Sequence, residues 1–102
     1  MTLDEYAAWA SGIRGAHDSM SPEMSELSYL GLGLAGECGE VVELIKKRLR
    51  DGAWDNDRLA DELGDLAYYW ARLCVAGGHA PSDVLHRSRD KIASKIKIKT
   101  GR

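Results

Sequence analysis

The sequence predicts an all-α protein whose four main helices form a helical bundle. In two long segments, residues 27–49 and 59–73, apolar residues recur at steps of three and four, which places them along one face of a helix. Residues that typically begin and end helices flank both segments. The one alternating strand pattern, at residues 96–99, is too isolated to build a sheet. A chain of 102 residues has room for one core, so we expect a single domain spanning residues 1–102.

The first element is a short helix that we expect to run to about Ala10. Thr2 and Glu5 have the spacing of a capping box, in which each side chain accepts a hydrogen bond from the backbone of the other residue. Tyr6 and Trp9 lie one turn apart on this helix. The pattern therefore predicts a capped N-terminal helix that carries two aromatic side chains.

A longer helix follows a loop that we predict at residues 11–21. The loop contains two glycines and shows no clear period. The helix begins either at Ser21, which precedes Pro22, or near Ser25, and it continues to about Arg50. Its predicted apolar seam consists of Leu27, Leu30, Leu34, Cys38, Val41, Ile45 and Leu49.

Turn-forming residues at 51–57 connect this helix to the next one, so the two helices are expected to fold back antiparallel. Asp55 or Asn56 caps the second partner of this pair, and Gly77 ends it. Pro81 opens the last helix. The helix that ends at Gly77 has an apolar seam of Leu59, Leu63, Leu66, Trp70 and Leu73. The last helix carries Val84, Leu85, Ile92 and Ile96.

Charge and cysteine content exclude several classes of protein. The net charge of −2 argues against general affinity for nucleic acid, although seven Lys/Arg and one acidic residue follow from Arg87 onward. No apolar run approaches the roughly 20 residues of a membrane span, and no signal peptide precedes Thr2. Cys38 and Cys74 lie on predicted apolar faces, far from any CxxC spacing, which indicates buried reduced thiols. We expect a cytoplasmic protein with neither a membrane nor a nucleic-acid partner.

Two acidic pairs stand out within the antiparallel helices. Glu37 and Glu40 are three residues apart, as are Glu62 and Asp65, so each pair presents its carboxylates from one side of a helix. Both pairs border an apolar seam, where converging carboxylates repel one another unless a cation neutralises them. Oxygen ligands without histidine or thiolate suit Mg²⁺ or Mn²⁺, and Mg²⁺ readily takes phosphate oxygens as further ligands. Acidic residues also solubilise surface helices, and the spacing alone leaves both readings open.

Several glycines lie inside the predicted helices, where each costs about 1 kcal/mol relative to alanine. Gly36, Gly39 and Gly64 cluster beside the acidic pairs. We interpret them as positions where another helix backbone or a ligand approaches closely. A kinked, locally weak helix is the alternative, and the pattern predicts nothing specific for Gly31 and Gly33.

Two segments of the chain resemble the MazG-like nucleotide pyrophosphohydrolases. They are GLGLAGECGEVVELIKK at residues 31–47 and DELGDLAYY at residues 61–69. The signature of that family is ExxE, a spacer and then ExxD, and here 21 residues separate Glu40 from Glu62, within the family's range. The resemblance covers nearly the whole chain and is weakest between residues 11 and 26.

This resemblance implies an all-α enzyme that assembles as a homodimer or homotetramer. It implies hydrolysis of (deoxy)nucleoside triphosphates between the α and β phosphates, which releases a monophosphate and pyrophosphate and serves nucleotide-pool house-cleaning. Glu37, Glu40, Glu62 and Asp65 match the Mg²⁺ ligands and catalytic carboxylates of the family, with Mn²⁺ as a substitute ion. The resemblance does not assign the general base to one of them.

The resemblance also implies residues that contact the substrate. Lys47 matches a lysine of the first motif, and Tyr69, one turn after Asp65, matches a tyrosine of related enzymes. Lys91 matches a lysine near the C-terminus, but Ser88 stands where members of the family often have Asn. A charge that merely solvates the last helix is the alternative for Lys91.

Three alternative functions and the role of two aromatic residues remain open at this point. The related phosphoribosyl-ATP pyrophosphohydrolases share the fold and the metal chemistry, and a non-catalytic helical module would bind nucleotide without turnover. Tyr6 and Trp9 either stack on a base or only dock the first helix. The basic segment at residues 87–102 would favour nucleic-acid binding only if a salt-sensitive DNA complex depended on it.

Overall fold

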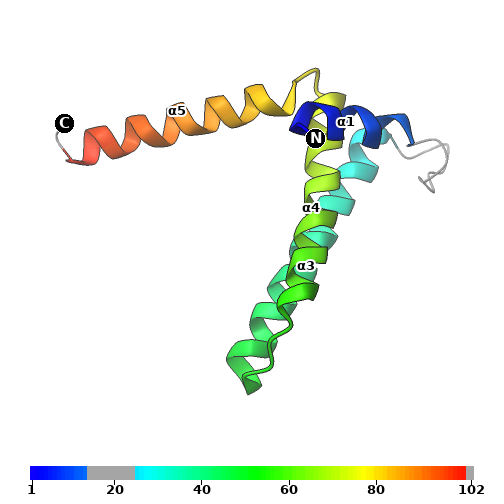
Figure 1. Cartoon of the computed structure of the whole chain (residues 1–102), viewed down its shortest axis with the longest axis vertical. Helices are drawn as coiled ribbons and strands as arrows, with labels where there is room; N and C mark the ends of the chain where they lie inside the picture. Colours follow the sequence, from blue (N-terminus) through cyan, green and yellow to red (C-terminus); the bar gives the residue numbers. More distant parts are fainter. Residues whose placement is uncertain (14–24, 101–102) are drawn as a thin grey trace.

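The computed structural model describes residues 1–13 and 25–100, with side chains placed up to residue 97. The helices in this part of the chain are α1 (Leu3–Gly12), α3 (Glu26–Asp51), α4 (Asn56–Ala76) and α5 (Pro81–Thr100). Residues 1–13 and 25–100 contain no strand, which confirms the all-α prediction. Within the described residues, no helix has the length and the apolar character that crossing a membrane requires. The fold is thus one long antiparallel pair, α3 and α4, with α1 at one end of the pair and α5 projecting away from it (Figure 1).

Helix α1 begins with the predicted capping box. The Thr2 hydroxyl accepts a hydrogen bond from the Glu5 N–H at 3.0 Å, and the Glu5 carboxylate accepts one from the Thr2 N–H at 2.8 Å. The helix continues through Gly12, so the predicted loop is wrong at its first two residues, because the backbone ladder extends until the Ile13 N–H bonds to the Trp9 carbonyl. Beyond Ile13, the rest of that loop and the alternative helix start at Ser21 lie outside the described residues.

Helices α3 and α4 begin and end at the residues that the sequence indicates. Ser25 caps α3, its hydroxyl accepting a hydrogen bond from the Ser28 N–H at 3.1 Å. Gly52 ends α3 with a φ of 77°, a left-handed conformation that favours glycine. Asp55, not Asn56, caps α4. Gly52 and the short turn after it let α3 and α4 run antiparallel, as Figure 1 shows.

The face of α3 that packs on α4 is rotated from the predicted apolar seam. Cys38 is exposed, so the prediction of a buried thiol is wrong there, whereas Cys74 is buried and both cysteines are free. Leu27, Ile45 and Leu49 are 57%, 45% and 83% exposed. The inward stripe consists of Leu30, Leu34, Glu37, Val41 and Leu44, in which the first and last members are buried and the others half-buried. Leu30, Leu34 and Val41 belong to the predicted seam. Glu37 and Leu44 do not, because the seam continued through Cys38 and Ile45 and a search for apolar positions passes over a carboxylate.

The close approach between α3 and α4 occurs at Gly33. A Cβ atom built there would collide with the ring of Tyr69, so only glycine admits this contact. At Gly36, Gly39 and Gly64 a Cβ atom would meet nothing within 4 Å. The expectation that another helix of this chain approaches at those three glycines is therefore wrong. The approach of a ligand to them stays a prediction.

Helix α5 does not pack along the α3–α4 pair. Its first turn is tied to α1, because the Asp4 carboxylate accepts hydrogen bonds from the Ser82 N–H at 3.0 Å and the Ser82 hydroxyl at 2.7 Å. From there α5 leaves the α3–α4 pair at a wide angle (Figure 1). Leu85, Ile92 and Ile96 on α5 stay exposed, because in a single chain no neighbouring helix covers them within the described residues.

Candidate active site

Three of the four predicted carboxylates meet where α3 faces α4. One carboxylate oxygen each from Glu37, Glu62 and Asp65 lies within 4.8 Å of the others. Glu37 comes from α3, while Glu62 and Asp65 lie one turn apart on α4. The antiparallel pairing of the two helices therefore brings together ligand atoms that are 25 or more residues apart in the sequence. This set of three is called the carboxylate cluster below.

Glu37 has the least favourable surroundings for a negative charge within this cluster. Its Oε2 atom is buried and has no hydrogen-bond partner. Burial raises the pKa of Glu37 above its ordinary value, a side-chain hydrogen bond with Glu62 raises it further, and the charges of Asp65, Glu62 and Glu40 add to the shift. A cation between the three carboxylates would satisfy the buried oxygen and offset this repulsion.

The carboxylate cluster therefore fits a divalent cation with a preference for oxygen. All three donors are carboxylates, which suit Mg²⁺ or Mn²⁺ better than softer ions. Glu37, Glu62 and Asp65 are the residues that would hold it. When bound, such an ion supplies Lewis-acid chemistry at a phosphate group.

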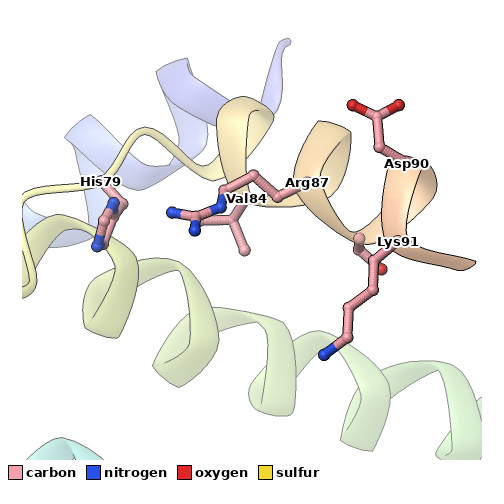
Figure 2. Close-up of a pocket in the computed structure, with 6 residues that line it drawn as sticks. His79, Val84, Arg87, Asp90 and Lys91 are labelled. Atoms are coloured by element: carbon pink, nitrogen blue, oxygen red, sulfur yellow. The ribbon is translucent and has the colours of Figure 1, made fainter.

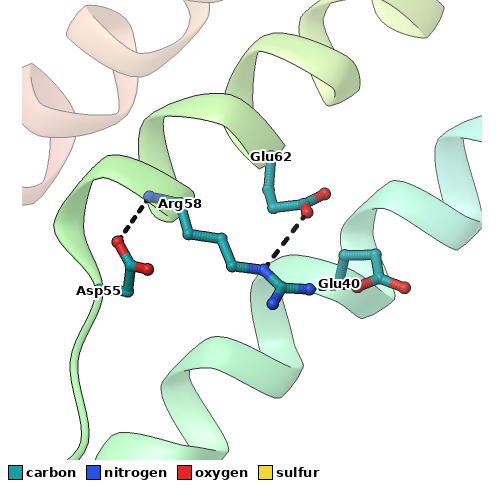
Figure 3. Close-up of polar contacts among 4 residues, drawn as sticks. All are labelled: Glu40, Asp55, Arg58 and Glu62. Carbon is teal, nitrogen blue, oxygen red and sulfur yellow. Dashed lines mark hydrogen bonds and ion pairs between the residues drawn. The ribbon is translucent and has the colours of Figure 1, made fainter.

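Glu40 lies apart from the carboxylate cluster and pairs with an arginine instead. The Nη2 atom of Arg58 is 3.8 Å from Glu40 Oε2, and its Nε atom is 3.8 Å from Glu62 Oε1. Figure 3 shows the Arg58 side chain reaching from the start of α4 to the two glutamates. Sequence analysis missed Arg58, although its position four residues before Glu62 is the spacing of a helical ion pair.

A cleft of about 510 Å³ opens beside the carboxylate cluster. Glu37 and Asp65 line it from α3 and α4, and Tyr6 and Trp9 line it from α1. Its remaining lining residues are Ile13, Gly64, Tyr68 and Tyr69. The cleft therefore joins carboxylates to aromatic rings, and docking α1 on α4 is what places Tyr6 and Trp9 there.

Tyr69, the predicted substrate contact on α4, is half-buried in this cleft. Its ring lies over Gly33, 6.3 Å from the ring of Tyr29 and 5.2 Å from that of Tyr68. Burial raises the pKa of its hydroxyl, with further contributions from Tyr29 and Glu37. Tyr69 is therefore a neutral hydrogen-bonding group beside the cluster. Tyr68 lines the same cleft and accepts a hydrogen bond from Arg72 at 3.1 Å.

Lys47 lies beyond Glu40, toward the turn between α3 and α4. It lines a small cavity of about 190 Å³ together with Arg58 and Trp54. Trp54 is itself covered by the guanidinium of Arg48, 5.0 Å from the ring centroid. The structure thus gathers positively charged side chains at one end of the groove between α3 and α4, the end that lies away from the aromatic cleft.

Lys91 is not brought to the carboxylate cluster. It lines a separate cavity of about 780 Å³ on α5, together with His79, Arg87 and Ser88. Figure 2 shows Lys91 and Asp90 pointing to opposite sides of α5. The departure of α5 from the α3–α4 pair is the physical reason for this separation, since Lys91 lies about 15 Å along α5 from Pro81.

The sequence comparisons agree with the geometry of the site. The family model described as the MazG nucleotide pyrophosphohydrolase domain matches residues 25–97, which run from the cap of α3 into α5. The chain belongs to this MazG nucleotide pyrophosphohydrolase family. It is similar to the Gene 37 protein of Mycobacterium phage L5, with 38% identity over 103 residues, covering 93% of this chain and 89% of that protein. No solved structure matches the chain at a significant level.

Proposed function

We propose that the protein is a Mg²⁺-dependent enzyme that hydrolyses (deoxy)nucleoside triphosphates between the α and β phosphates. The observation that carries this proposal is the carboxylate cluster, with its unpartnered Glu37 Oε2, at the edge of an aromatic cleft. Membership of the family supports the reaction type. The products are a nucleoside monophosphate and pyrophosphate, and the role is cleansing of the nucleotide pool.

Different residues of the α3–α4 groove are proposed to contact different parts of the substrate. Glu37, Glu62 and Asp65 hold the ion, and Glu40 joins them as the fourth proposed ligand. Aromatic rings stack on bases whatever their identity, so Tyr6 and Trp9 suit the nucleoside end of the substrate. We assign to Tyr69 a hydrogen bond with the sugar or the phosphates of the substrate. Lys47, at the opposite end, neutralises the terminal phosphates.

The enzyme is proposed to act as a homodimer or a dimer of dimers. Apolar side chains on α3 and α5 are exposed in one chain, including Leu49 and Ile92. The segment from Arg87 onward carries a charge of about +6 against about −8 for the residues before it, so α5 complements the acidic body of a second copy. Lys91 then contacts the substrate only through that assembly.

A product assay tests the reaction. A panel of ribo- and deoxynucleoside triphosphates is incubated with and without Mg²⁺, and pyrophosphate is separated from phosphate. We expect monophosphate and pyrophosphate, formed only with Mg²⁺, and a loss of about 100-fold or more in the rate for Glu62→Gln and Asp65→Asn. Glu43→Gln on the exposed side of α3 is the matched control and keeps its rate. Nucleotide binding without turnover would overturn the proposal in favour of a non-catalytic module.

A further inference from the structure

The end of the α3–α4 groove that lies away from the aromatic cleft contains a positive charge, the guanidinium of Arg58. Arg58 lies between Glu40 of α3 and Glu62 of α4, with both nitrogen–oxygen separations at 3.8 Å. Glu62 is also a member of the carboxylate cluster, so the same carboxylate is close both to the proposed ion site and to Arg58. One carboxylate is thus shared between a built-in cation and the site proposed for a divalent cation.

The contacts of Arg58 are easily exchanged. The side chains of Arg58 and Glu40 are 50% and 52% exposed, whereas that of Glu62 is 15% exposed. Both separations, at 3.8 Å, exceed the range of a hydrogen bond, and an ion pair with so exposed a guanidinium contributes little to stability. By contrast, the backbone of Arg58 is fixed, because its N–H donates to the Asp55 carboxylate at 3.0 Å. A guanidinium on an anchored backbone can therefore leave Glu62 without disturbing the helix (Figure 3).

The position of Arg58 along the groove indicates what it meets after leaving. Arg58 precedes Asp65 by seven residues, or about 10 Å along α4, on the side away from the aromatic cleft. Lys47 lines the same small cavity as Arg58. A guanidinium presents paired donors that match the oxygens of a phosphate group. This end of the groove therefore suits the phosphates that leave.

We propose that Arg58 is a resident counter-cation that yields Glu62 to the divalent ion and then binds the pyrophosphate portion of the substrate. The second half rests on the proposed function, whereas the first half does not. Before the ion binds, Arg58 offsets the repulsion between Glu40 and Glu62. After it binds, the displaced guanidinium lies next to the terminal phosphates together with Lys47.

Mg²⁺ affinity, measured by calorimetry in the absence of nucleotide, tests the first half. Arg58→Ala removes the competing charge, so we expect Mg²⁺ to bind about three- to tenfold more tightly than to the unsubstituted protein. Arg58→Lys keeps the charge and stays near the original affinity. The control is Arg50→Ala, which removes an equally exposed guanidinium paired with Asp51 at 3.6 Å. Unchanged or weaker Mg²⁺ binding in Arg58→Ala would contradict the role of Arg58 as a counter-cation.

Binding of inorganic pyrophosphate in saturating Mg²⁺ tests the second half. We expect Arg58→Ala to weaken it about tenfold, with partial recovery in Arg58→Lys, which cannot form the paired contact. Unchanged pyrophosphate affinity in Arg58→Ala would overturn the phosphate role. Neither measurement depends on turnover. If the protein hydrolyses no triphosphate but Arg58→Ala binds Mg²⁺ more tightly, the proposed function is contradicted and the counter-cation role of Arg58 is supported.

Discussion

Glu37 occupies a position on α3 where an amphipathic helix would ordinarily bury an aliphatic side chain. It lies between Leu34 and Val41 on the stripe that packs against α4. Its buried oxygen lacks a partner, and burial together with the nearby carboxylates raises its pKa. A group whose folded-state pKa is raised disfavours folding most at pH values above that pKa, and the penalty fades as the pH falls toward 4.5. At the scale of the residue, Glu37 lowers the stability of the metal-free protein, which fits its proposed role as a metal ligand.

Glu37→Gln is therefore expected to stabilise the metal-free protein at pH 7. The amide removes the buried charge, so the gain in stability should shrink as the pH is lowered toward 5. In the unsubstituted protein, Mg²⁺ at about 100 times its dissociation constant should add about 2.7 kcal/mol, and the variant should lose most of this gain. Urea unfolding at pH 7 and pH 5, with EDTA or Mg²⁺, measures both effects.

The control for this change is Glu43→Gln, which neutralises an exposed glutamate of the same helix. Its Mg²⁺-dependent stabilisation should match that of the unsubstituted protein. Equal Mg²⁺-dependent stabilisation of Glu37→Gln and the unsubstituted protein would show that Glu37 does not hold the ion.

At the scale of the element, α5 depends on a cap that another helix supplies. The Asp4 carboxylate of α1 accepts hydrogen bonds from the hydroxyl and the N–H of Ser82 in the first turn of α5. The side-chain bond and then the backbone bond lower the pKa of Asp4 below 3.8. The same carboxylate thus satisfies a free N–H group of α5 and fixes where α5 leaves the molecule.

We expect Asp4→Asn to loosen the start of α5. Because the pKa of Asp4 is lowered in the folded state, its contribution is complete above pH 3.8 and is lost as the pH falls through the lower, folded-state value. Hydrogen exchange of the Ser82 amide at pH 6 should be faster in Asp4→Asn by a few-fold. Asp83→Asn makes the same charge change in the same turn and is the control. Equal exchange rates in the two variants would argue against a specific cap.

At the scale of the whole molecule, one chain leaves its apolar surface incompletely covered. The buried core of the described residues is small, and α5 presents Leu85, Ile92 and Ile96 to solvent. The positive charge of α5 and the negative charge of the α3–α4 pair lie on different parts of the chain. In a homo-oligomer, another copy of the chain would cover this apolar surface and its charge would neutralise the opposite charge. This is why we propose a homo-oligomer.

Sedimentation equilibrium at micromolar concentration tests this assembly. We expect a homodimer or a larger assembly, and we expect Ile92→Lys to weaken association by at least about tenfold, because it buries an unpaired charge. Ser94→Lys adds the same charge on the opposite side of α5 and should associate normally. A strictly monomeric profile for the unsubstituted protein would contradict the assembly.

The sequence by itself determined the helices and the residues that cap them. Local chemistry suffices for this, because capping boxes, glycine stops and periodic apolar positions act within a few residues. Thr2, Ser25, Asp55 and Gly52 all act as helix boundaries. The sequence also predicted the two acidic pairs, since their spacing alone places each pair on one side of its helix.

Only the tertiary structure decided which faces meet. The inward stripe of α3 includes Glu37 and excludes Cys38, because packing against α4 selects a face that apolar periodicity does not single out. It also decided that Gly33, rather than Gly36, admits the Tyr69 ring, and that Arg58 lies close to both Glu40 and Glu62. These outcomes depend on the rotation of one helix against another and on the docking of α1. Both are set by contacts between residues far apart in the chain, which no local pattern encodes.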